Sequence, residues 1–159
     1  MKISTSNFFT TSDGVHIYFE DRGKGLPIVM VPGFLCTTRF FEKNAEVLSK
    51  EFRVITLDLR GQGNSSKCSG GNTVRRNAQD IRELIDYLQL EHVVLLGWSL
   101  ASSIVVSYAV EFKQHKLNGL VTMDGSLYPF SGEDWNHHRG KGYNLQNWFD
   151  NYLPLINDP

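Results

Sequence analysis

The sequence predicts an α/β protein with a doubly wound, mostly parallel sheet. Three observations support this fold class: short apolar runs that suit buried strands, longer segments with apolar residues at helical spacing, and the alternation of the two after an initial β-hairpin. The chain has 159 residues, 41% of them hydrophobic and 12% aromatic, which is enough to build the core of one domain.

Each predicted element rests on a local pattern. The tripeptide Ser12-Asp13-Gly14 is a turn signal between two segments with alternating polar and apolar residues, so the chain begins with a β-hairpin. Apolar residues three or four positions apart indicate the helices, and Thr37 or Thr38 can cap the first of them. We expect a hairpin from residues 7–11 and 15–21, strands at 26–31, 52–57, 93–96 and 117–123, and helices at about 39–50, 73–88 and 104–112.

Charge and composition argue against several classes of partner. The chain has 16 basic and 17 acidic residues, so no excess of charge would attract nucleic acid or an anionic membrane surface. Its apolar runs are far shorter than the roughly 20 residues that span a bilayer, and the N-terminus lacks the apolar core of a secretory signal. We therefore expect a cytoplasmic location. Cys36 and Cys68 are too few and too unpatterned for a zinc site or a disulfide scaffold, and we expect no metal.

The segment around Ser99 carries the clearest chemical signal. The apolar run 93–96 suits a strand buried on both faces, and it meets Gly97-Trp98-Ser99-Leu100-Ala101 before helix-compatible sequence begins. A serine at such a tight strand-to-helix turn is held in a strained backbone conformation with its hydroxyl thrust outward. The first N–H groups of the helix point toward the same place. This arrangement predicts a nucleophile with an anion site beside it.

Three segments in order resemble the α/β-hydrolase fold family. Gly97-x-Ser99-x-Ala101 is similar to its nucleophile elbow, G-x-S-x-G, with alanine at the second glycine. Pro32-Gly33-Phe34 resembles the family's oxyanion loop, with proline at the usual histidine, and 58–65 resembles its structural D-x-R-G-x-G-x-S loop. The resemblance covers nearly all of residues 7–153. Alanine at position 101 adds one methyl group, which the turn should tolerate with slight widening.

The resemblance implies an active site and a reaction. Ser99 would be the nucleophile, the main-chain N–H groups of Phe34 and Leu100 would be the oxyanion donors, and Asp124 would be the candidate acid. Asp124 could equally form a turn with Gly125. The implied activity is a serine hydrolase of the serine esterase or cofactor-free haloperoxidase-like branch. It would act on a small-molecule ester or related acyl substrate, without a cofactor. A serine at this position argues against the family's dehalogenases and epoxide hydrolases, which use aspartate.

The general base is the missing part of this site. In the family the histidine comes late in the chain, so the resemblance implies the N-terminal portion of the fold, truncated after the sixth strand. His92 and His115 precede strands and should lie at the wrong sheet edge, and His16 lies in the hairpin. Only His137 and His138 follow a strand near the site.

Two consequences and two alternatives follow. Residues 1–130 would form the core and 131–159 the beginning of a lid, whose aromatic residues could equally belong to a small helix. The strand at 117–123 would be an exposed edge through which the chain could self-associate. A non-catalytic fragment or binding module is one alternative function, and a cofactor-free perhydrolase or haloperoxidase is the other.

Overall fold

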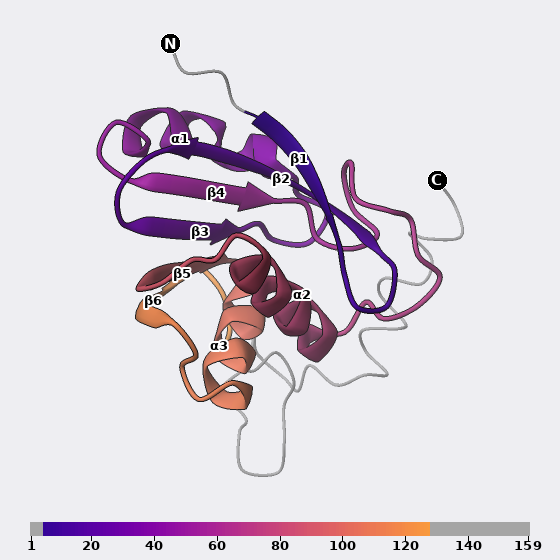
Figure 1. Ribbon diagram of the computed structural model, residues 1–159. Helices are drawn as coiled ribbons and strands as arrows, with labels where there is room; N and C mark the ends of the chain where they lie inside the picture. The colour runs from indigo at the N-terminus through magenta and orange to yellow at the C-terminus, as the bar shows by residue number, and fades with distance from the viewer. Residues whose placement is uncertain (1–4, 128–159) are drawn as a thin grey trace. The chain divides into compact units, whose positions relative to one another are not determined.

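The computed structural model describes residues 5–127, and side chains from Phe8 onward. Figure 1 shows six strands and the helices between them in the described part of the chain. The strands are β1 Thr5–Thr10, β2 His16–Gly23, β3 Pro27–Val31, β4 Arg53–Leu57, β5 Val93–Trp98 and β6 Leu117–Met123. The helices are the 3-10 helix η1 Thr38–Phe41 and the α-helices α1 Glu42–Leu48, α2 Val74–Tyr87 and α3 Ala101–Glu111.

The described strands form one sheet in the order β1-β2-β4-β3-β5-β6. The β1–β2 hairpin is antiparallel, and β2 pairs antiparallel with β4. The pairs β3–β4, β3–β5 and β5–β6 are parallel. Because parallel strands end at the same edge, the residues after β3, β5 and β6 meet there. This confirms the predicted fold class.

Alternating side chains give the sheet two apolar faces. On one face, Val29, Ile55 and Leu95 pack against helices α2 and α3 in the larger core cluster. On the other face, Met30 and Val54 pack against Phe41 and Ala45 of η1 and α1. Figure 1 shows α1 on the opposite side of the sheet from α2 and α3. The helices therefore cover both faces, as a doubly wound sheet requires.

The predicted helix at residues 39–50 differs from the structure. It is a 3-10 turn followed by the short helix α1, and no side chain caps either piece, so the capping prediction for Thr37 and Thr38 is wrong. The amide of Thr38 instead donates to the buried carboxylate of Asp58, 2.7 Å away. The helical spacing of Phe40 and Val47 predicts that both face the core, but both are exposed. Only Phe41 and Ala45 of this segment are fully buried there.

Strand β5 is less covered than its sequence predicts. Val93, Leu95 and Gly97 are buried, whereas the alternate residues are half-buried on the face toward α1. Strand β6 lies at one edge of the described sheet, with Leu120, Val121 and Met123 exposed. Self-association through this strand stays a prediction.

The chain divides into two units at Gly125 and Ser126, and the fold above belongs to the first. The predicted boundary at residue 130, the lid at 131–159, and His137 and His138 lie outside the described residues. Within 5–127, no helix is both long and apolar enough to cross a membrane.

Candidate active site

Ser99 lies on the turn between β5 and α3, and its backbone is left-handed with φ of 56°. That conformation is uncommon for a residue with a Cβ and marks local strain. The amide of Ser99 donates to Met123 O at 2.8 Å, and its carbonyl accepts from the amide of Ser102 at 2.9 Å. Helix α3 begins two residues later at Ala101. The predicted strand, tight turn and helix are therefore present.

Gly97 makes this turn possible. A Cβ at position 97 would overlap the carbonyl oxygen of Ala101 and lie 2.9 Å from a methyl carbon of Val105. The helix thus approaches the strand too closely for any side chain at residue 97. Ala101 is fully buried, so the second motif position accommodates a methyl group.

The loop after β3 lies against Ser99. A Cβ at Gly33 would lie 2.9 Å from the Ser99 Cβ and 3.0 Å from a ring carbon of Trp98. Phe34 follows directly, with 49% of its surface exposed, and Leu35 has a left-handed backbone with φ of 58°. The structure therefore brings the segment that carries the Phe34 amide to the elbow.

Asp124 follows β6 and lies at the same corner of the sheet. It is exposed, and its backbone is left-handed with φ of 48°. The next residue, Gly125, packs so closely that a Cβ there would overlap the carbonyl oxygen of Ser99 and the hydroxyl of Ser102. Both roles considered for Asp124, a carboxylate at the site and a turn residue, remain compatible with this position.

None of the three histidines in the described part of the chain lies within reach of Ser99. His92 precedes β5, whereas Ser99 follows it, and His115 likewise precedes β6. A strand of six residues is about 20 Å long, which separates these rings from the site. His16 begins β2, three strand positions from β5, or about 14 Å at the usual strand spacing. The base, if present, comes from residues outside 5–127.

The loop at residues 58–66 is structural, as predicted. Asp58 accepts from the amides of Thr38 and Asn64, at 2.7 Å and 2.8 Å. The guanidinium of Arg60 is buried and binds the carboxylate of Asp80 through two hydrogen bonds of 2.6 Å and 2.7 Å. It also binds Asp13 in the hairpin turn, with both contacts at 3.0 Å.

These contacts shift the pKa values of Asp13 and Arg60. Hydrogen bonds from Arg60 and then Thr11 hold the pKa of Asp13 well below its ordinary value. The carboxylate of Asp80 raises the pKa of Arg60 against the opposing effect of burial. The simplest prediction for the adjacent Arg75 and Arg76 is a solvated charged face, but Arg76 is half-buried and pairs with Asp80 and Glu83. In the sequence, only the four-residue spacing of Arg76 and Asp80 indicates this network.

An aromatic pair also stands beside the elbow. The ring of Phe40 stacks on Trp98, with centroids 3.9 Å apart and planes at 19°. Trp98 immediately precedes Ser99 and its ring contacts the position of Gly33. Phe40 therefore contributes an exposed apolar surface near the candidate nucleophile, and not to the core as its helical spacing predicts.

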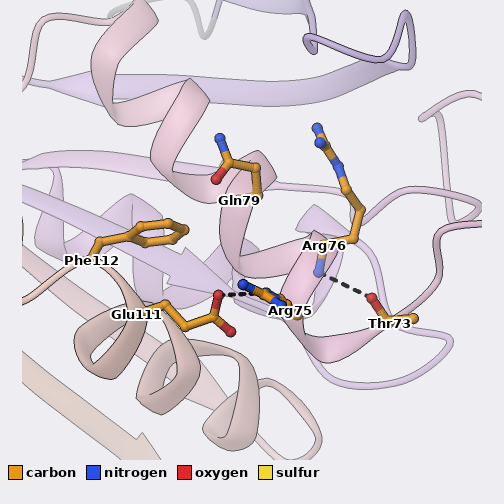
Figure 2. Close-up of a pocket in the computed structure, with 6 residues that line it drawn as sticks. All are labelled: Thr73, Arg75, Arg76, Gln79, Glu111 and Phe112. Atoms are coloured by element: carbon orange, nitrogen blue, oxygen red, sulfur yellow. Dashed lines mark hydrogen bonds and ion pairs between the residues drawn. The ribbon is translucent and has the colours of Figure 1, made fainter.

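A pocket of about 290 Å³ lies between α2 and α3, away from these residues. In Figure 2 the side chain of Arg75 points toward Glu111, and the two form an ion pair of 2.8 Å. None of the candidate residues Ser99, Leu100, Phe34 and Asp124 lines it. The lining residues are Thr73, Arg75, Arg76, Gln79, Glu111 and Phe112. Among the described residues, no group of three or more His, Cys, Asp or Glu side chains could hold a metal ion.

Comparison with known families identifies the fold. A family model described as alpha/beta hydrolase fold matches residues 27–156, which is most of the chain. The chain belongs to the α/β-hydrolase fold family. The match begins at β3 and includes the loop after β3, the 58–66 loop and the turn that carries Ser99.

Related proteins are named for different activities. A putative non-heme chloroperoxidase of Synechocystis sp. is 36% identical over 110 residues, 69% of this chain and 40% of that protein. An AB hydrolase superfamily protein of Bacillus subtilis is 29% identical over 126 residues, 79% of this chain and 47% of that protein. The chain thus spans about half the length of these relatives.

A solved structure shares the fold. An esterase from Exiguobacterium antarcticum superposes with a TM-score of 0.87 at 26% identity, covering 97% of this chain and 57% of the esterase. This α/β-hydrolase fold chain therefore shares the fold of part of the esterase.

Proposed function

We propose that this chain is part of a serine hydrolase that cleaves a small-molecule ester or related acyl substrate with Ser99 as nucleophile. The observation that carries the proposal is the left-handed Ser99 between β5 and α3, with the Gly33 backbone against its Cβ. We infer that this strained turn directs the Ser99 hydroxyl toward the main-chain amides of Phe34 and Leu100. The esterase and the family membership support the same reaction class.

The proposed reaction runs in two steps. The Ser99 oxygen attacks the carbonyl carbon and loses its proton to a base, and the N–H groups of Phe34 and Leu100 bind the resulting oxyanion. Collapse expels the alcohol, which takes the proton, and leaves an acyl group on Ser99. Water then attacks this ester and regenerates the serine. Each oxyanion donor contributes on the order of 3 kcal/mol to lowering the barrier. Asp124 is the proposed acid that orients the base.

Covalent labelling tests the nucleophile directly. A fluorophosphonate should phosphonylate Ser99 in the folded chain, with the added mass on the peptide that contains this residue. Ser99→Ala should abolish the labelling and the hydrolysis of p-nitrophenyl acetate. Ser107→Ala serves as the control, because Ser107 lies farther along α3 and bonds to Glu111. Labelling that persists in Ser99→Ala would overturn the proposal, and a folded chain that never reacts would favour a non-catalytic binding module.

A cofactor-free perhydrolase is a second candidate, favoured by the relative named as a putative non-heme chloroperoxidase. The same acyl-serine would then be attacked by hydrogen peroxide in place of water, which releases a peracid that oxidises bromide. Bromination of phenol red in acetate with peroxide and bromide tests this route. Loss of bromination in Ser99→Ala would support this route. Ester hydrolysis without bromination would contradict it and leave ester hydrolysis as the proposed activity.

A further inference from the structure

The carboxylate of Asp58 joins two loops at the candidate site. It is fully buried directly after β4, and each of its oxygens accepts one main-chain N–H. Oδ1 accepts from Thr38 at 2.7 Å and Oδ2 from Asn64 at 2.8 Å. A buried charge without such donors would be strongly unfavourable, so both contacts are needed for this side chain to remain in place.

Asp58 is itself held firmly. Its amide donates to the carbonyl of Tyr18 on β2 at 2.9 Å. Its carbonyl accepts from the Ser65 hydroxyl at 2.6 Å, and the same hydroxyl accepts from the Tyr18 amide. The carboxylate is therefore a fixed point relative to the sheet.

The contact with Thr38 fixes the far end of the oxyanion loop. This loop, residues 32–37, leaves the sheet after Val31, whose register partner on β5 is Gly97. The amide of Cys36 donates to Gly33 O at 3.1 Å, which closes a turn around Phe34 and Leu35. Asp58 holds the next residue, Thr38. The loop is thus held at both ends, and Phe34 lies within its turn.

Gly63 adds a steric contact to the same arrangement. A Cβ at Gly63 would overlap Asp58 Oδ2 and lie 2.9 Å from the side-chain methyl of Thr37. The loop at 58–66 therefore reaches both the carboxylate and the end of the oxyanion loop.

From these contacts we infer that Asp58 is a positioning residue, which sets the Phe34 amide for oxyanion binding through the Thr38 N–H. The inference rests on the proposed function of Ser99. It requires an acidic side chain at residue 58, because asparagine has one acceptor oxygen and its NH₂ group would face one of the two amides. A displaced oxyanion donor slows the chemical step more than it weakens substrate binding.

Two variants interrupt the contact from opposite sides. Asp58→Asn removes one acceptor. Thr38→Pro removes the N–H and leaves the carboxylate intact. Proline suits this position, since it begins a helical turn and the preceding Thr37 is extended with φ of −125° and ψ of 178°. Thr38→Ala keeps the N–H and is the matched control. Ser66→Ala is a second control on the same loop, because the Ser66 hydroxyl accepts from the His16 amide at 3.2 Å and not from Asp58.

The first measurement is reaction rate in the full chain. Asp58→Asn and Thr38→Pro should lower both the phosphonylation rate of Ser99 and kcat for p-nitrophenyl acetate by about tenfold or more, with KM within about twofold. Thr38→Ala and Ser66→Ala should stay within about twofold of the unmodified chain. Wild-type rates in a folded Thr38→Pro would overturn the inference, and so would an equal loss in Ser66→Ala.

The second measurement is independent of activity. Amide hydrogen exchange should accelerate in peptides covering residues 33–38 in Asp58→Asn and Thr38→Pro, whereas Ser66→Ala should accelerate exchange mainly in 59–66. Unreactive Ser99 in the unmodified chain would refute the proposed function, but exchange would still decide whether Asp58 orders the loop. Unchanged exchange at 33–38 would overturn the positioning role. If Asp58→Asn does not fold, the reaction rates and hydrogen exchange of Thr38→Pro test the positioning role of Asp58.

Discussion

The main-chain nitrogen of Ser99 lies 2.8 Å from the carbonyl oxygen of Met123, so a main-chain hydrogen bond joins the elbow to the end of β6. The residues after these two strands, Ser99 and Asp124, share a left-handed backbone, with φ of 56° and 48°. Two strained residues that meet at one sheet edge are typical of a functional site, since the surrounding structure must stabilise both. The packing around this bond makes the small residues nearby sensitive to substitution.

Gly97→Ala should destabilise the fold. Its methyl group would overlap the Ala101 carbonyl oxygen and crowd Val105, and relief requires α3 to move from the strand. We expect a loss of at least about 2 kcal/mol in the free energy of unfolding, measured by urea denaturation. Gly119→Ala on β6 is the control, because its Cβ would meet only Val94 methyl carbons at 3.7 Å and 3.9 Å. Equal stability of the two variants would contradict the close approach described here.

Gly33→Ala should impair reactivity more than stability. The new Cβ would press on Ser99 Cβ and on the Trp98 ring, and so displace either the loop after β3 or the serine. We expect the phosphonylation rate at Ser99 to fall about tenfold or more, since small misplacements of reacting groups are costly. Gly70→Ala is the control, because no heavy atom lies within 4 Å of its Cβ position. A labelling rate equal to that of the control would show that the loop does not contact the nucleophile.

Local patterns predicted the fold and the elbow. Buried strands and helical periodicity are properties of short segments, and the apolar positions of α2 predicted from its spacing are buried or packed against the core. The strain at Ser99 follows from the immediate change from strand to helix. For these features, nearby residues alone specify the conformation.

Contacts between distant residues could not be predicted. Arg60 binds Asp80, 20 positions away, and Asp13, 47 positions away. The Asp58 carboxylate likewise meets Thr38, 20 positions away. The same contact explains the failed capping prediction, because the carboxylate satisfies the first amide of η1. The prediction that Phe40 lies in the core is wrong for a similar reason, since its ring stacks on Trp98, which belongs to a different element.

Breaking the Arg60–Asp80 pair should cost far more than breaking a surface pair. Their side chains are 1% and 2% exposed, so Arg60→Met leaves the Asp80 carboxylate with only Arg76 as a cationic partner. We expect a loss of about 3 kcal/mol or more in the free energy of unfolding, measured by urea denaturation. Arg75→Met is the control. Arg75 is 82% exposed beside Glu111, and surface pairs contribute about 1 kcal/mol or less. Similar losses in both variants would contradict a buried network.

Acid should destabilise the chain partly through Asp13. Arg60 and then Thr11 hydrogen-bond its carboxylate, so its pKa in the folded chain lies well below the ordinary value of 3.8. Because the folded state holds this proton less tightly than the unfolded state, the stabilisation is complete above about pH 4 and is lost as the pH falls further. Asp13→Asn removes the titrating group while keeping an oxygen that can accept from Arg60. We therefore expect the free energy of unfolding of this variant to fall less steeply between about pH 4 and pH 2 than that of the unmodified chain. Urea denaturation at a series of pH values measures both slopes, and identical slopes would mean that Asp13 does not bind Arg60 in solution.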